Sequence, residues 1–207
     1  MERPLCERLD FDLGTPVSHF PPGSGYNRVM RYIAFLRAIN VGGRVVKMER
    51  LRELFTEMGC TKVETFIASG NVIFESREKN ELALQERIET QLEKSLGYGV
   101  ETFLRTDNEL KGVAAHRAFS EKEIGGGTVY VAFLATKPSK AAVTALTSHR
   151  GEVDEFRIDG REVYWLCRKS FSESEFSKAR LEKVLGTRAT VRNSSTVRKI
   201  AAKYPAL

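Results

Sequence analysis

Cysteine and histidine are scarce in this sequence, which contains three residues of each. Cys6, Cys60 and Cys167 are odd in number and far apart, so their spacing predicts neither a disulfide framework nor a clustered metal site. Cys60 follows a glycine at a predicted helix end, and Cys167 ends an apolar strand. Buried thiols are commoner than nucleophiles at such positions, so we expect reduced, structural cysteines and no bound metal.

Obvious catalytic groups are also missing. His19, His116 and His149 are isolated, and no His-Cys-Asp cluster has the spacing of a metal site or a hydrolase. Carboxylates are plentiful, but no pair stands out as an acid–base couple. The sequence therefore identifies no catalytic residue, implies no cofactor and leaves enzymatic activity uncertain.

Long apolar runs are absent. No segment approaches the ~18 consecutive apolar residues that span a bilayer, and the first eight residues lack the apolar core of a secretory signal. Residues 1–29 contain four prolines and a Gly-Ser-Gly run without periodicity, which predicts a flexible extension, either native or vector-derived. We expect a cytosolic protein.

Positive charge exceeds negative charge, with a formal net charge of +6 and a pI near 9.3. The excess is concentrated at one end, since ten basic and only three acidic residues follow from Arg168 to the C-terminus. Two interpretations stay open: a solvated basic helix face, or a basic surface that binds anions.

The first half of the chain alternates short apolar strands with amphipathic segments. Met48, Leu51, Leu54, Phe55 and Met58 form one apolar stripe, which is typical of a helix. The resulting order is β-α-β-β-α-β. Strands are predicted over 32–36, 63–68, 72–74 and 100–104, and helices over 47–58 and 80–96.

The second half repeats this order after a connecting helix at 107–116, for which Asp107 is the predicted cap. Asp159 and Gly160 predict a two-residue hairpin turn. Strands are predicted over 129–134, 152–158, 161–167 and 189–191, and helices over 138–148, 173–185 and, as a terminal basic helix, 193–204.

The repeated order predicts an α+β fold of two tandem ferredoxin-like modules (α/β plaits), followed by a C-terminal basic helix. Several strands are apolar at consecutive positions, which predicts sheets covered on both faces. The predicted domains are a flexible extension at 1–29, a first module at 30–105, a connecting helix and glycine-rich linker at 106–127, and a second module at 128–207.

Three segments, 37–43 (RAINVGG), 69–74 (SGNVIF) and 189–197 (ATVRNSSTV), resemble the bacterial family called domain of unknown function 1697. The resemblance extends from about Met30 to the C-terminus. It implies a tandem ferredoxin-like fold and brings no activity. The chain departs from the family pattern in its N-terminal extension and at Ser194 and Ser195, where a bulkier pair that often includes tryptophan is expected.

Candidate ligand-binding residues follow predicted strands or turns. Arg37 and Asn40 precede Gly42 and Gly43, where glycine lets a backbone approach a ligand and present N–H groups to an anion. The segment lacks the P-loop ending and the dinucleotide-binding spacing. A tight turn, with Asn40 bonded to its own backbone, explains the same residues.

Two further groups complete the candidate set. Ser69 and Asn71 flank a glycine and are explained equally well by a hairpin turn. Arg192, Asn193 and Thr196 stand at the start of the last helix, where anions bind, although Asn193 can serve simply as the helix cap.

Three hypotheses follow. The leading one is a binding protein for an anionic ligand, either nucleic acid or a phosphorylated metabolite; it would not be a standard RNA-recognition module, because the exposed aromatic pattern is missing. The second is a small-molecule enzyme between the modules, which requires convergence of its candidates on one pocket. The third is a structural module that self-associates through its sheets. The candidates in the second hypothesis are Arg37, Asn40, Asn71, Arg192 and Asn193.

Overall fold

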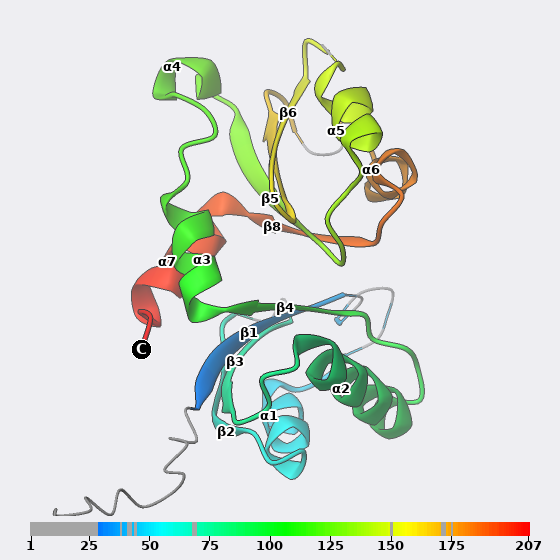
Figure 1. Ribbon diagram of the computed structural model, residues 1–207, viewed down its shortest axis with the longest axis vertical. Helices are drawn as coiled ribbons and strands as arrows, with labels where there is room; N and C mark the ends of the chain where they lie inside the picture. Colours follow the sequence, from blue (N-terminus) through cyan, green and yellow to red (C-terminus); the bar gives the residue numbers. More distant parts are fainter. Residues whose placement is uncertain are drawn as a thin grey trace, which may run out of the picture.

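A computed structural model describes residues 29–37, 39–40, 43, 45–67, 70–149, 151–170, 173–174 and 176–207. The extension predicted over residues 1–29 therefore lies, except for Val29, outside the described residues. The described chain is an α+β structure with two four-stranded antiparallel sheets and their helices (Figure 1).

The first sheet has the strand order β2-β3-β1-β4, and all its pairs are antiparallel. Two helices cover one face. The longer of them, α2, begins where the Asn80 side chain accepts a hydrogen bond from the backbone N–H of Ala83, and it ends at Gly97. The elements are β1 (Met30–Leu36), α1 (Met48–Glu57), β2 (Thr61–Thr65), β3 (Asn71–Ser76), α2 (Glu81–Leu96) and β4 (Thr102–Thr106).

The second sheet has the equivalent order β6-β7-β5-β8 and is also antiparallel. Helices α3 and α4 precede it, and α7 follows it. Figure 1 shows α3 and α7 beside the junction of the two sheets. The elements are α3 (Asp107–Ala115), α4 (Glu121–Ile124), β5 (Thr128–Leu134), α5 (Lys140–Thr147), β6 (Asp154–Asp159), β7 (Glu162–Cys167), α6 (Lys178–Leu185), β8 (Ala189–Asn193) and α7 (Ser194–Lys203).

Alternate residues of β1 enter different cores, because successive strand side chains point to opposite faces. Tyr32 and Ala34 pack against the cluster that α1 and α2 complete. Ile33 and Phe35 belong to a central cluster that also contains residues of β5, β7, α3 and α7. A third cluster lies between the second sheet and helices α5 and α6. The prediction of sheets covered on both faces is confirmed.

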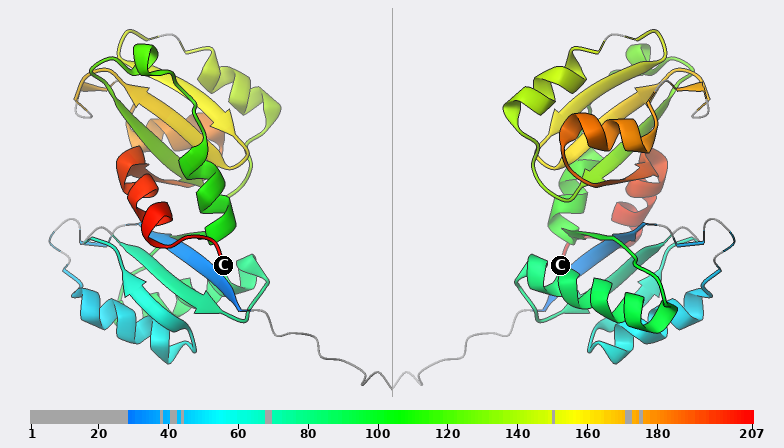
Figure 2. Two further views of the ribbon diagram at one scale, coloured as in Figure 1. Left: turned by 90° about the vertical axis from the view of Figure 1, so that its left-hand side faces the viewer. Right: turned by 90° about the vertical axis from the view of Figure 1, so that its right-hand side faces the viewer.

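The central cluster joins the two halves of the molecule. The rings of Phe35 and Phe133, from β1 and β5, stack with centroids 4.0 Å apart and an interplanar angle of 12°. Figure 2 shows α3 and α7 together at this junction in two further views. Each sheet therefore buries its second face against the other half of the chain.

Several predicted boundaries are wrong. Helix α6 begins at Lys178 rather than 173, because Ser177 is its cap, and the preceding Ser174 hydroxyl donates to the Asp154 carboxylate. Helix α3 is capped by Thr106 rather than Asp107. Strand β6 extends through Asp159, which pairs with Glu162, so the turn lies one residue later.

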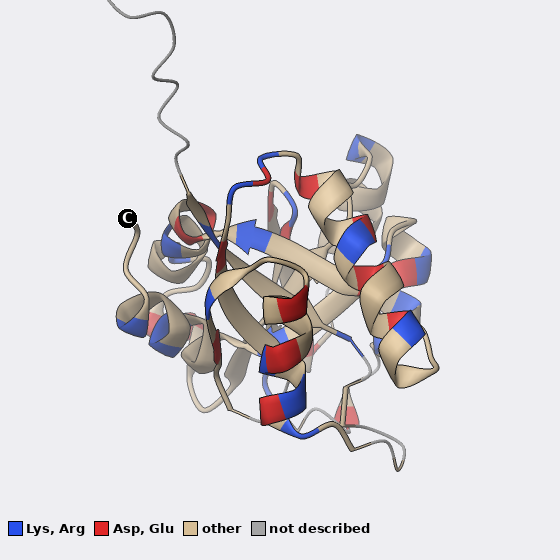
Figure 3. Cartoon of the chain, turned by 90° about the horizontal axis from the view of Figure 1, so that it is seen from below, with Lys and Arg blue, Asp and Glu red and all other residues tan. Residues whose placement is uncertain are grey.

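Basic and acidic residues are interspersed along α1 and α2, as the colouring of Figure 3 shows in the view from below. None of the helices in the described part of the chain is long and apolar enough to cross a membrane.

Candidate functional site

The end of β1 is the point where the predicted candidates come closest together. The backbone N–H of Leu36 donates to the carbonyl of Gly70 at 2.7 Å. The Leu36 carbonyl accepts a hydrogen bond from Arg192 Nη2 at 2.8 Å. Strand β1, the turn before β3 and strand β8 therefore meet at Leu36.

Arg192 is fixed there by neutral oxygen atoms. Its Nε donates to Asn71 Oδ1 at 2.7 Å, and Nη1 donates to Thr190 Oγ1 and the Val191 carbonyl, both at 2.9 Å. The guanidinium also lies over the Phe35 ring, 5.6 Å from its centroid. Burial lowers the pKa of Arg192 to about 10. No carboxylate among the described residues pairs with this guanidinium.

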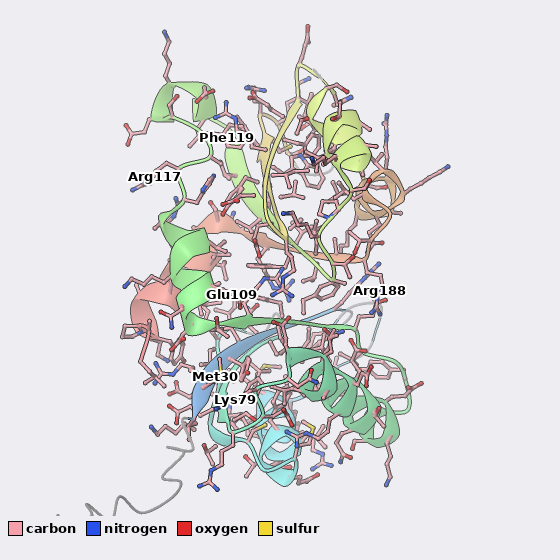
Figure 4. The ribbon with its side chains drawn as sticks, in the orientation of Figure 1. Met30, Lys79, Glu109, Arg117, Phe119 and Arg188 are labelled. Atoms are coloured by element: carbon pink, nitrogen blue, oxygen red, sulfur yellow. The ribbon has the colours of Figure 1, made fainter. Side chains whose placement is uncertain are left out.

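Arg37, which follows Leu36, is paired instead with two carboxylates. Its Nη1 lies 2.7 Å from Glu101 Oε2 and 2.6 Å from Glu182 Oε1. Glu101 is shared with Arg188, at 3.2 Å. Figure 4 shows Arg188 at the edge of the molecule beside the junction of the two halves.

Lys178, the first residue of α6, adds a fourth cation. Its side chain is half-buried and makes no hydrogen bond or ion pair with a described residue. Burial lowers its pKa, as do the neighbouring charges of Arg37 and Arg192, whereas Glu182 and Glu101 act in the opposite direction. Of these four basic side chains, only Arg37 and Arg188 form ion pairs with Glu101 or Glu182. We call Arg37, Lys178, Arg188 and Arg192 the β1-end cluster.

The remaining candidates have local roles or lie outside the described residues. Asn40, with a φ of 56°, accepts a hydrogen bond from the Val46 N–H at 2.6 Å through Oδ1. Asn193 caps α7 by accepting from the Ser195 N–H at 2.8 Å, and Thr196 lies in the first turn of that helix. The remaining three are glycines and a serine: Gly43 has a φ of 81°, and Gly42 and Ser69 fall outside the described part.

The structure thus brings Arg37, Asn71 and Arg192 together. The side chains of Asn40 and Asn193 instead accept hydrogen bonds from backbone N–H groups two to six residues further along the chain. The convergence of all five that the enzyme hypothesis requires is not observed among these described residues. A hollow of about 480 Å³ borders Arg37 and Arg188, but Glu89, Glu93 and Glu101 also line it. Anions would be disfavoured in that hollow.

Lys178 was not predicted as part of the site. Its spacing of four from Glu182 places both side chains on one helix face, which is the signal that could have suggested it. The sequence does not show that this face meets the end of β1. In the described part of the chain, no group of three His, Cys, Asp or Glu side chains is placed to hold a metal ion.

Comparison with known protein families identifies one family that matches the chain. The profile of a family described as "Protein of unknown function (DUF1697)" matches residues 29–164, well over half of the sequence. The chain belongs to this family. The match covers Arg37, Asn40 and Asn71, whereas Lys178 and Arg192 lie beyond its end.

The DUF1697 chain also resembles a solved structure, the conserved bacterial protein SP0830 from Streptococcus pneumoniae. The TM-score is 0.67 at 21% sequence identity, and the match covers 85% of this chain and 98% of the other. At that identity the likeness supports the fold alone. No curated protein matches the sequence.

Proposed function

We propose that this protein binds a small anionic metabolite, one that carries a phosphate or carboxylate group, at the β1-end cluster. The observation that carries the proposal is the pair Lys178 and Arg192, two partly buried cations without a carboxylate partner among the described residues. Arg37, Asn71 and the backbone at Leu36 hold the surroundings in place.

The physical reason is the cost of uncompensated charge. Removing a charge from water is unfavourable unless a charged or hydrogen-bonding partner offsets the loss. Neutral oxygens satisfy the Arg192 hydrogen bonds but do not neutralise its charge, and Lys178 has two cations nearby. A bound anion would offset this charge, and Lys178 would supply three free N–H donors.

A small ligand is favoured over nucleic acid because much of the C-terminal positive charge is engaged within the chain. Arg168 pairs with Glu155, Arg188 with Glu101, and Lys203 with Glu64. Arg192 points into the junction between the sheets. The described residues therefore support a local cationic site better than a continuous basic track along a polynucleotide backbone.

We also infer that the two halves are tandem ferredoxin-like modules. The support is the β-α-β-β-α-β order found twice and the equivalent strand orders of the two sheets. The proposed site then lies where the end of the first module's β1 meets β8 and α6 of the second. The apolar faces that suggested self-association pack against each other within the chain.

Titration calorimetry with pyrophosphate at constant ionic strength tests the proposal. Lys178→Met removes the unpaired charge and keeps the length of the side chain. Lys183→Met is the matched control, because Lys183 is exposed on the same helix. We expect Lys178→Met to weaken binding by about tenfold, the value of one charge-assisted hydrogen bond, and Lys183→Met to leave it unchanged.

Two results would contradict the proposal: no saturable pyrophosphate binding to the unmodified protein, or equal losses in the two variants. A parallel titration with single-stranded RNA over a salt series tests the alternative. RNA binding that exceeds pyrophosphate binding and falls steeply with salt would favour a nucleic-acid ligand.

A further inference from the structure

A separate cavity of about 340 Å³ lies between α3, the segment joining α3 to α4, the second sheet and the start of α7. Figure 4 labels two of its residues, Arg117 and Phe119, on the α3–α4 segment. Arg188 of the β1-end cluster lies at the opposite side of the same view. The cavity is therefore distinct from the site proposed above.

The walls of the cavity are partly apolar and partly polar. Val113, Val129, Val131 and Ile124 line it, and Phe119 is held beneath the guanidinium of Arg157, whose carbon lies 4.4 Å from the ring centroid. Small-molecule sites typically combine such walls with a few polar groups. The volume and the lining suit the body of a small organic molecule.

One wall is a stacked pair of rings. His116 lies parallel to Tyr164, with centroids 4.4 Å apart and an interplanar angle of 22°. Both residues line the cavity. The wall that they form is therefore partly flat and aromatic, which favours a planar ligand.

Tyr164 supplies an unused polar group. The residue is only 3% exposed, and its hydroxyl makes no hydrogen bond with a residue in the described ranges. The hydroxyl oxygen is not among the fully buried polar atoms that lack a partner, so it is open to the cavity that Tyr164 lines. Burial raises the pKa of Tyr164, with smaller contributions from Glu162 and Asp159. The phenol stays protonated at neutral pH and can donate a hydrogen bond to a ligand.

Cations line the same cavity. Arg117 and Arg198 form no ion pair with a described carboxylate, and Arg198 Nη2 donates to the hydroxyl of Ser194 at 3.0 Å. Ser194 is the first residue of α7, where the helix dipole favours negative charge. Glu121 also lines the cavity and partly offsets these charges.

We infer that this cavity binds a small planar organic acid. The ring of the ligand would pack between the apolar walls and the Tyr164–His116 pair, and the acid group would face Arg198, Arg117 and the start of α7. The Tyr164 hydroxyl would donate to an oxygen of the ligand. This binding function is additional to the one proposed for the β1-end cluster.

Benzoate and the isosteric neutral benzamide are suitable probes, with binding followed by backbone amide NMR shifts. We expect benzoate to bind more tightly than benzamide, with shifts at Tyr164 and Ser194. Tyr164→Phe retains the ring and removes the hydroxyl, and Arg198→Gln removes one charge. Each variant should weaken benzoate binding by about tenfold, as expected for the loss of one hydrogen bond to a charged group.

Arg87→Gln is the matched control, because Arg87 is an exposed arginine on α2, remote from the cavity lining. Ala114→Phe fills the cavity from α3 and should abolish binding. Equal affinities for the two probes, no saturable shift, or benzoate binding that survives Ala114→Phe would overturn the inference. A loss caused by Lys178→Met instead would assign the bound acid to the β1-end cluster.

Discussion

Two arginines at the junction of the sheets differ in how their charge is compensated. Arg105 is only 1% exposed, and its Nε lies 2.6 Å from Glu162 Oε1. Its other nitrogens donate to backbone carbonyls, among them that of Leu134 at 3.0 Å. Arg192 has only neutral acceptors. The Arg105 charge is therefore balanced by a carboxylate within the chain, whereas the Arg192 charge is not.

Substituting Arg105 tests how much the junction depends on this buried pair. We expect Arg105→Ala to lower the free energy of unfolding by about 3–5 kcal/mol, because Glu162, 13% exposed, loses its partner. Arg50→Ala, which removes exposed ion pairs with Glu53 and Glu57 on α1, should lower the unfolding free energy far less. Urea denaturation measures both. Similar losses of unfolding free energy in the two variants would show that the buried Arg105–Glu162 pair stabilises the fold no more than exposed pairs do.

Cys60 is expected to be chemically inert in the folded protein. Burial raises the pKa of its thiol from 9.0 to about 11, so the reactive thiolate at pH 8 is roughly 100-fold rarer than in the unfolded chain. Iodoacetamide should therefore modify Cys60 far more slowly in buffer than in urea. The rate is measured by mass spectrometry of the peptide that contains it. Equal rates in both conditions would contradict the expected burial.

At the residue scale, sequence patterns predict only part of the candidate site. Arg37, Asn71 and Arg192 stand next to glycines or strand ends, and the structure brings them together. Tyr164 carries no local signal, and the only local signal for Lys178 is its spacing of four from Glu182. The role proposed for each residue depends on side chains that lie far away in the sequence. Only tertiary packing brings those side chains to Lys178 on α6 and to Tyr164 on β7.

At the scale of elements, the turn before β3 is packed tightly on β1. Gly70 has a φ of +70°, and a Cβ there would lie 3.0 Å from the Leu36 carbonyl oxygen and 3.2 Å from Leu36 Cβ. The carbonyl of the same turn accepts the hydrogen bond from the Leu36 N–H. Gly70 is therefore required both by backbone conformation and by the close approach of the two segments.

Two glycine substitutions separate these requirements. Gly97, at the end of α2, has a φ of +76°, but a Cβ at this position would have no atom within 4 Å. Gly97→Ala should cost about 1 kcal/mol of unfolding free energy, from the left-handed conformation alone. Gly70→Ala should cost about 1–3 kcal/mol more, because the methyl group also overpacks against Leu36. Equal urea midpoints for the two variants would disprove the close packing.

The order of strands and helices along the chain could be predicted because most strands contain a short apolar run bounded by turn signals; β2 (Thr61–Thr65), which has one apolar residue, is the exception and was predicted two to three residues too late. Helix starts were less predictable. Glu173 and the serines around it have the composition of a helix start, yet Ser174 is bonded to Asp154 and the helix begins after Ser177. Helix α4 was not predicted, since its four residues are too few to show a period.

At the scale of the whole molecule, the central cluster makes the two halves depend on each other. It takes Phe35 and Phe103 from the first sheet and Phe133 and Leu166 from the second. Exposing this cluster would leave an apolar face on each sheet in water. We therefore expect the halves to unfold together rather than as independent domains.

The chain contains one reporter in each half for this cooperativity. Trp165, the single tryptophan, lies in the cluster beneath α5 and α6, and Cys60 lies in the cluster of α1 and α2. In urea, Trp165 fluorescence and Cys60 labelling should change at the same midpoint. Phe133→Ala should lower both midpoints together, with a loss of about 3–5 kcal/mol, because it empties the shared cluster. If Cys60 became accessible at a urea concentration that leaves Trp165 fluorescence native, the halves would be separable, and a ligand at the β1-end cluster would be expected to hold them together.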